Sequence, residues 1–174
     1  DWIIGVGLDS DEKDNPPIKF TEVFARARNE GFKLTMHCDV NQTDIVDHIW
    51  QCLDDIQVDR IDHGINALED ERLCAEIAKR GLGLTVCPVS NRFVVQSLTT
   101  KEIKSMLQKG MKATINSDDP GYFRAYLTDN FLALIEEAEF SQDEIRQLNA
   151  NAFETSWLSA ARKKYYLEQV NNFS

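Results

Sequence analysis

Short apolar segments of strand length recur along the chain at a nearly constant spacing, and this recurrence constrains the fold more than any other feature. They begin near residues 3, 33, 58, 82 and 112, so successive starts are 24–30 residues apart. A repeat of that length accommodates one β-strand and one α-helix that returns the chain to the start of the next strand. The spacing therefore predicts an α/β domain with a parallel sheet over residues 1–174.

The segments between these strands carry apolar residues at helical spacing. We expect the first helix to bury Phe20, Val23, Phe24 and Ala27, and the first strand, residues 2–8, to be buried on both faces. Further helices are expected from about residue 43 and over 69–80, 100–109, 122–137, 141–151 and 154–170, with a capping box of Ser141 and Glu144. Five such units are enough for an open sheet, whereas a (β/α)8 barrel needs eight strands and typically ~250 residues.

Charge and composition exclude several classes of partner. The formal net charge is −10 and the pI is about 4.7, which argues against a nucleic-acid backbone or an anionic membrane surface as partner. No apolar run approaches the ~18 residues of a membrane span. The four cysteines are dispersed and form no C-x-x-C pair, which favours reduced thiols and the cytoplasm.

The last predicted strand runs directly into two adjacent carboxylates and a proline, Asp118-Asp119-Pro120. Proline ends a strand because it has no backbone N–H to donate. Ligand-bearing strand ends are where α/β barrels carry their chemistry. Taken alone, the stretch is more typical of a strand followed by an Asp-rich turn that a proline ends.

Polar side chains also follow the other predicted strands. In a parallel α/β fold these strand ends share one rim, so residues far apart in sequence converge there. The residues concerned are Ser10, His37, His63, Ser90, Asp118 and Asp119. A neutral imidazole and a carboxylate are zinc ligands, and zinc makes hydroxide available near pH 7. The alternatives are a hydrogen-bonded structural role for each histidine and a simple turn at Cys87-Pro88.

Four motifs in this order resemble the adenosine/adenine deaminase family of the amidohydrolase superfamily, and within it the microbial adenine deaminase-like branch. They are Thr35-Met36-His37-Cys38-Asp39, Arg60-Ile61-Asp62-His63-Gly64, Thr85-Val86-Cys87-Pro88-Val89-Ser90-Asn91 and Thr114-Ile115-Asn116-Ser117-Asp118-Asp119-Pro120. The resemblance covers essentially the whole chain. It implies the last five βα units of a (β/α)8 TIM-type barrel plus C-terminal helices.

The resemblance also implies residue roles. His37 would bind zinc, His63 would orient and polarise the attacking water, and Asp118 would bind zinc and accept the proton of that water. Asp119 would hydrogen-bond the purine at N7, and Ser10 matches a position whose backbone contacts the base. The implied reaction is addition of zinc hydroxide to C6 of a 6-aminopurine, followed by loss of ammonia from a tetrahedral intermediate. Adenine, converted to hypoxanthine, is the substrate that the branch implies.

Two departures from the family pattern bear on activity. The H-x-H pair that supplies two further zinc ligands is absent from the sequence, together with three of the eight barrel strands. We therefore expect a single, incomplete metal-dependent hydrolase-type domain, which is either the C-terminal segment of a longer enzyme or one piece of a divided chain and is inactive alone. Many members also carry a glutamate that protonates the purine where this chain has Val40, so Asp39 or a group outside the chain is the candidate acid.

Three alternative functions remain at this stage. The first is deamination of adenosine or an N6-substituted adenine. The second is hydrolysis of a different amide, amine or ester by a metal hydrolase of the same superfamily. The third is a catalytically decayed amidohydrolase-like module that serves in binding or assembly.

Overall fold

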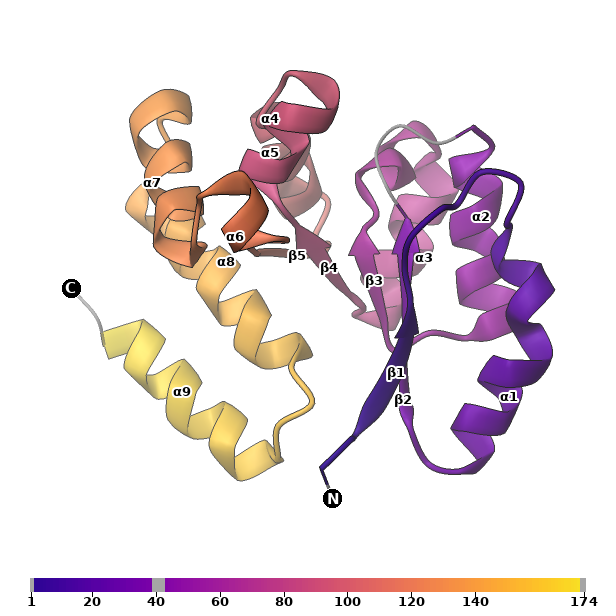
Figure 1. The fold of residues 1–174 in the computed structure, drawn as a ribbon. Helices are drawn as coiled ribbons and strands as arrows, with labels where there is room; N and C mark the ends of the chain where they lie inside the picture. The colour runs from indigo at the N-terminus through magenta and orange to yellow at the C-terminus, as the bar shows by residue number, and fades with distance from the viewer. Residues whose placement is uncertain (1, 39–42, 173–174) are drawn as a thin grey trace.

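A computed structural model describes residues 2–38 and 43–172, and its centre is a parallel β-sheet (Figure 1). The strands follow one another in the order β1-β2-β3-β4-β5, and every neighbouring pair is parallel. Their bounds are β1 (Gly5–Leu8), β2 (Lys33–Cys38), β3 (Arg60–His63), β4 (Gly83–Val86) and β5 (Lys112–Ile115). The prediction of five parallel strands in an α/β arrangement is therefore confirmed.

The two faces of this sheet differ in polarity, because side chains alternate along each strand. One face carries fully buried apolar residues that are paired in register across neighbouring strands: Met36, Ile61, Leu84 and Ala113 form one such row. The opposite face carries polar residues that are half-buried: Thr35, His37, Arg60, Asp62 and Thr85. The apolar face packs in the main hydrophobic core, which leaves the polar face for the site described below.

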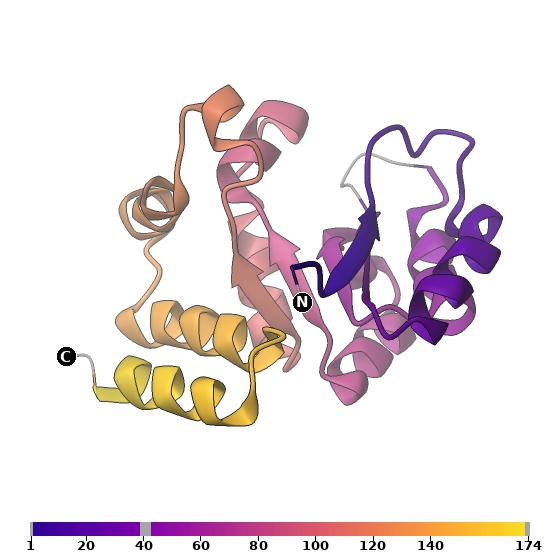
Figure 2. The same ribbon diagram turned by 60° about the horizontal axis from the view of Figure 1, so that its bottom comes forward.

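Helices cover the sheet from both sides. In Figures 1 and 2 the helices α1, α2 and α3 lie on one side, and α8 and α9 lie on the other. The α-helices are α1 (Thr21–Asn29), α2 (Ile45–Gln51), α3 (Glu71–Arg80), α4 (Pro88–Val95), α5 (Thr100–Gln108), α6 (Pro120–Phe123), α7 (Leu127–Ala138), α8 (Gln142–Thr155) and α9 (Ala160–Asn172). Two 3₁₀ helices, η1 (Pro17–Phe20) and η3 (Ile65–Glu69), and one π-helix, η2 (Cys52–Ile56), accompany them in the described residues. The capping box at the start of α8 is confirmed, and the backbone N–H of Ser141 lowers the pKa of Glu144.

Several details of the sequence-based prediction are wrong. Residues 2–4 precede β1 and are exposed instead of buried, and Val23 points outward from α1. Residues 88–95 form α4, because a proline fits the first turn of a helix where its missing N–H is not needed. The helix expected over 122–137 is divided between α6 and α7, since Arg124 adopts a left-handed conformation with a φ of 53°. The segment 154–170 is likewise interrupted between α8 and α9.

The last residue of α8 and the connection to α9 pack against the N-terminal ends of the strands. A Cβ atom at Gly5 would lie 2.5 Å from the Trp157 ring, and one at Gly83 would lie 2.7 Å from the Thr155 hydroxyl. Both glycines therefore permit a close approach that a larger residue would block. The guanidinium of Arg60 lies 4.3 Å from the centroid of the Trp157 ring, which adds a cation–π contact to this end of the sheet.

Within the part of the chain that the structure describes, no helix combines the length and the apolar character that a bilayer crossing requires.

Gly64 follows β3 directly, and its substitution tests how tightly the end of that strand is packed. Its φ is 73°, and a Cβ atom there would lie 2.8 Å from Leu84 Cδ2 and 2.9 Å from Ile61 Cγ2. Gly110 has the same φ, yet a Cβ atom there would meet nothing within 4 Å. We expect Gly110→Ala to lower the free energy of unfolding by about 1–2 kcal/mol through backbone strain alone. Gly64→Ala should cost about 1–3 kcal/mol more, because its methyl group also overpacks the core.

Urea unfolding of both variants, with Gly121→Ala as an unstrained control, measures this difference. Equal losses for Gly64→Ala and Gly110→Ala would show that the end of β3 is not tightly packed.

Candidate metal-dependent active site

A cavity of about 700 Å³ opens at the C-terminal ends of the strands. The residues that line it come from the polar face of the sheet, from the segment after β5 and from helices α7 and α8. Among them are His37, His63, Cys87 and Asp118. Three of the predicted site residues, which lie 26–81 positions apart in sequence, therefore line a single cavity, as their strand-end positions predicted.

His37 is held in a defined orientation by a carboxylate. Its Nδ1 lies 2.5 Å from Glu12 Oε1, and Glu12 comes from the loop that follows β1. The carboxylate of Glu12 accepts hydrogen bonds, so the contact favours a proton on Nδ1 of His37. That Nε2 lies 2.9 Å from Nε2 of His63 and 3.5 Å from Oδ1 of Asp9. The Nε2 atom of His37 therefore faces the polar groups of the rim.

His63 reaches the rim through an unusual backbone conformation. Strict alternation would put it on the apolar face, because it follows Ile61 by two residues and pairs in register with Cys38. Its φ is 60°, in the left-handed region that a non-glycine residue seldom adopts, and the following Gly64 is left-handed as well. His63 is 4% exposed, and its ring meets the His37 ring edge-on, with centroids 4.5 Å apart. Strain of this kind is characteristic of functional sites.

Asp118 and Cys87 complete the polar rim on the far side of His63. Asp118 also has a positive φ, 55°, and its Oδ2 lies 3.7 Å from His63 Nε2. Ligand atoms of His63, Cys87 and Asp118 all lie within 4.8 Å of one another. The arrangement thus gathers imidazole nitrogens, a carboxylate and a thiol around one point, which is the donor chemistry of metal sites in hydrolases.

The other predicted site residues lie further out. Ser10 has a φ of 99° and lines an adjacent hollow of about 310 Å³, where it is accompanied by His37 and His48. Asp119 is exposed and precedes α6. Asp39, the candidate acid, and Val40 lie outside the described residues. The roles given to these residues stay predictions.

Three carboxylates near the histidines were not anticipated. Glu12 and Asp9 lie on the loop after β1 and contact His37, and Asp62 lies beside His37 on the polar face of the sheet. Asp9 and Glu12 belong to an acidic stretch whose composition is typical of a solvent-exposed loop. Their position directly after a predicted strand could have identified Asp9 and Glu12 as candidate site residues, because the same position identified Ser10.

Cys38 and Cys52 come together on the opposite side of the sheet from the cavity. Their Sγ atoms are 3.7 Å apart, and both residues are fully buried among apolar side chains. The hydrogen bond with Cys52 and the burial raise the pKa of the Cys38 thiol. A protonated thiol on the apolar face, away from the cavity, is not a metal ligand.

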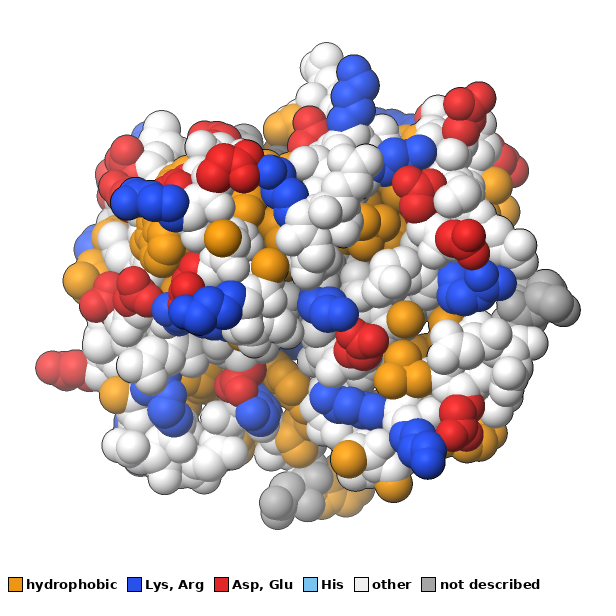
Figure 3. All heavy atoms as spheres, turned by 180° about the vertical axis from the view of Figure 1, so that it is seen from behind, with side chains coloured by type: hydrophobic (Ala, Val, Ile, Leu, Met, Phe, Trp, Pro, Cys, Tyr) orange, Lys and Arg blue, Asp and Glu red, His pale blue; other side chains and the backbone are white. Residues whose placement is uncertain are grey.

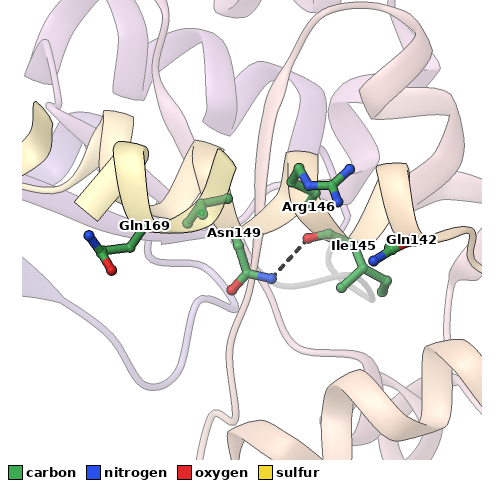
Figure 4. Close-up of a pocket in the computed structure, with 6 residues that line it drawn as sticks. Gln142, Ile145, Arg146, Asn149 and Gln169 are labelled. Atoms are coloured by element: carbon green, nitrogen blue, oxygen red, sulfur yellow. Dashed lines mark hydrogen bonds between the residues drawn. The ribbon is translucent and has the colours of Figure 1, made fainter. Parts of the chain in front are cut away.

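A separate pocket of about 390 Å³ lies between α8 and α9 (Figure 4). Its walls are formed by Gln142, Ile145, Arg146, Asn149, Gln169 and Val170. The side-chain amide of Asn149 donates to the backbone oxygen of Ile145, so this polar group is used within the helix itself. The pocket contains none of the predicted site residues. The reverse side of the molecule, in Figure 3, carries acidic and basic side chains that are interspersed over the helices.

A parallel α/β sheet with histidine and aspartate at the C-terminal ends of its strands is the arrangement in which α/β-barrel enzymes carry their active sites. The family model described as adenosine deaminase matches residues 1–173. The chain belongs to the adenosine deaminase family.

Two curated relatives illustrate this membership. An uncharacterized deaminase from Schizosaccharomyces pombe is 47% identical over 173 residues, which is 99% of this chain and 51% of that protein. An adenine deaminase from Marinomonas sp. is 44% identical over 98% of this chain and 51% of its own length. The chain therefore spans about half the length of the curated relatives that it matches.

Solved structures agree with the fold. The crystal structure of adenine deaminase from Arthrobacter aurescens superimposes with a TM-score of 0.91 at 38% identity, and the match covers 97% of this chain and 52% of that one. An amidohydrolase from Burkholderia ambifaria, solved with bound Zn, gives a TM-score of 0.85 at 24% identity over 98% of this chain and 48% of that one. The five βα units thus correspond to about half of an adenine deaminase fold.

The Glu12 contact predicts the tautomer of His37. In Glu12→Ala the acceptor at Nδ1 is lost, so we expect the proton to redistribute between the two ring nitrogens. Glu12→Gln should largely retain the original tautomer, because its side-chain oxygen also accepts a hydrogen bond. Long-range ¹H–¹⁵N correlation of the histidine rings distinguishes the two cases. Identical ring spectra for the wild type and Glu12→Ala would contradict the assignment.

Proposed function

We propose that this chain carries the purine-binding part and half of the metal shell of a zinc-dependent deaminase that converts adenine to hypoxanthine and ammonia. The observation that carries the proposal is the convergence of His37 Nε2, His63 Nε2 and Asp118 Oδ2 on one rim, with separations of 2.9 and 3.7 Å. The adenine deaminases among its relatives, 39–47% identical, favour adenine over adenosine or an N6-substituted adenine.

The donor set fits zinc. His37 offers Nε2 while Glu12 holds Nδ1, an arrangement in which a carboxylate orients a metal-binding imidazole and raises its basicity. Asp118 follows β5, whereas His37 lies on β2, and it offers a carboxylate oxygen. Bound zinc would lower the pKa of a water molecule to about 7 and so supply the nucleophile at neutral pH. His37 and Asp118 alone fall short of the three protein ligands that catalytic zinc normally has. We expect the H-x-H pair of the family, which this chain lacks, to supply two further histidines from outside it.

The chain's own residues would then act on the water and the purine. His63 would orient the water for attack at C6, and Asp118 would accept its proton. Asp119 would bind the purine at N7, with one proton shared between the two groups, and the Ser10 backbone would contact the base. The proton required at the ring would come from Asp39 or from a group outside the chain.

A complete catalytic unit would need more of the barrel. In the part of the chain that the structure describes, β1 and β5 each pair on one side only, so both can accept a further parallel strand. We propose that three further βα units, on the same chain or on a separate one, close the sheet and bring the remaining zinc ligands. The 174 residues alone would then form one incomplete domain without deaminase activity. Free thiols at all four cysteines are typical of the cytoplasm, which we propose as the location.

Deamination of adenine by the full-length protein, followed by the ultraviolet change from adenine to hypoxanthine, tests the proposal. We expect His63→Ala to lower kcat by about 10²–10⁴-fold, because the water loses its orienting group. Zinc content should be retained, since His63 is not assigned as a ligand. Lys101→Ala is the control: Lys101 is exposed on α5 and lines neither the cavity nor the adjacent hollow, so its removal should leave kcat near that of the wild type.

The outcomes separate the alternatives. A zinc-loaded protein that turns over neither adenine nor adenosine would contradict purine deamination and would favour another amide or amine substrate. A full-length protein that purifies without zinc and does not take it up would identify a decayed module. His63→Ala with wild-type kcat would remove His63 from the mechanism.

A further inference from the structure

A row of side-chain hydrogen bonds crosses the three central strands on the polar face of the sheet. The hydroxyl of Thr35 on β2 donates to Asp62 Oδ2 at 2.6 Å, and the hydroxyl of Thr85 on β4 donates to Asp62 Oδ1 at 2.9 Å. Asp62 on β3 is therefore fixed from both sides. We call this row the Thr35–Asp62–Thr85 ladder.

The ladder lies immediately beneath the rim. Thr35 precedes His37 by two residues on β2, Asp62 directly precedes His63, and Thr85 precedes Cys87 by two residues. Asp62 is also the register partner of both His37 and Thr85. Because alternate residues of a strand point to the same face, Thr35 and His37 share the polar face with Asp62. Each residue of the ladder thus lies one or two positions before a residue of the rim.

A nearby guanidinium balances the negative charge of Asp62. Arg60 Nε is 3.3 Å from Asp62 Oδ1, and the same guanidinium packs on Trp157. Asp62 is half-buried and lines the cavity, so it keeps both hydroxyl donors in a setting that excludes much of the competing water. Hydrogen bonds to a carboxylate are shorter and stronger than those between neutral groups.

Backbone pairing alone does not explain where the His63 ring lies. The backbone leaves the extended conformation at His63, with a φ of 60°, so the backbone pairing of β3 with its neighbours ends at that residue. The last residue before this bend is Asp62, and its side chain is anchored to β2 and β4. The anchor therefore fixes the peptide from which the bend starts, and with it the direction of the imidazole.

We propose that Asp62 is a positioning residue: through Thr35 and Thr85 it holds the ends of β2, β3 and β4 so that the imidazoles of His37 and His63 meet at 2.9 Å. The kinetic consequence of this role rests on the proposed function, whereas its structural consequence does not.

Paired substitutions of the threonines test the proposal in the full-length protein. Thr35→Val and Thr85→Val keep the side-chain shape but remove the hydroxyl, and Thr35→Ser and Thr85→Ser keep the hydroxyl. Thr155→Val is the control, since Thr155 donates to the Asn151 backbone in α8 and takes no part in the ladder. The readout is the ring ¹⁵N spectrum, with His37 and His63 assigned by their loss in His37→Gln and His63→Gln.

We expect each valine variant to shift the ring signals of His37 and His63 and to leave those of His48 unchanged. The serine variants and Thr155→Val should give the wild-type spectrum. Valine variants with wild-type ring signals, or variants in which His48 shifts as much as the other two, would overturn the proposal. Asp62→Asn provides a second route if a valine variant does not fold: it keeps the shape and one acceptor oxygen, and it should shift His63 as the valine variants do.

The kinetic arm separates this proposal from the proposed function. If the protein deaminates adenine, the valine variants should lower kcat by about 10–100-fold with little change in KM, because misplaced groups act mainly on the transition state. A wild-type kcat in both valine variants would overturn the positioning role. Absence of deamination in the wild type would contradict only the proposed function, because the ring spectra are measured without substrate.

Discussion

The parallel in-register pairing of β2, β3 and β4 is the constraint on which the rest of the structure depends. Register partners in adjacent parallel strands present their side chains to the same face, so the pairing of Met36 with Ile61 and of Ile61 with Leu84 builds the apolar face of the core. The same register brings His37, Asp62 and Thr85 together on the opposite face. A shift by one residue would reverse both faces at once, exposing the apolar row and burying the charged one.

The site also depends on a departure from that regularity. His63 would follow Ile61 into the core if β3 continued as an extended strand, and the left-handed conformations of His63 and Gly64 turn its ring back to the rim. Asp118 has a left-handed backbone too. For the non-glycine residues His63 and Asp118 such a conformation costs about 1–3 kcal/mol each, so it persists only where the surrounding packing maintains it. Here the packing around Gly64 and the hydrogen bonds of Asp62 both act at the residues next to His63.

The five parallel strands and the rim were predictable because they depend on features that are local in sequence: apolar runs, their spacing, and the polar residue that follows each run. The contacts that orient the rim were not. Glu12 meets His37 across 25 positions, and Asp62 meets Thr35 across 27, so neither pair leaves a short motif. The helix α4 was missed because Cys87-Pro88 has the composition of a turn, although proline is equally suited to a first helical turn.

Zinc-edge anomalous scattering from crystals of the full-length protein tests the central claim most directly. The account predicts a single strong peak at the C-terminal ends of the strands, about 2.0–2.2 Å from His37 Nε2 and from an Asp118 oxygen. His63 should lie beside the ion without coordinating it. A peak bound elsewhere, or a structure in which His37 and Asp118 bind no metal although zinc was supplied, would contradict the account.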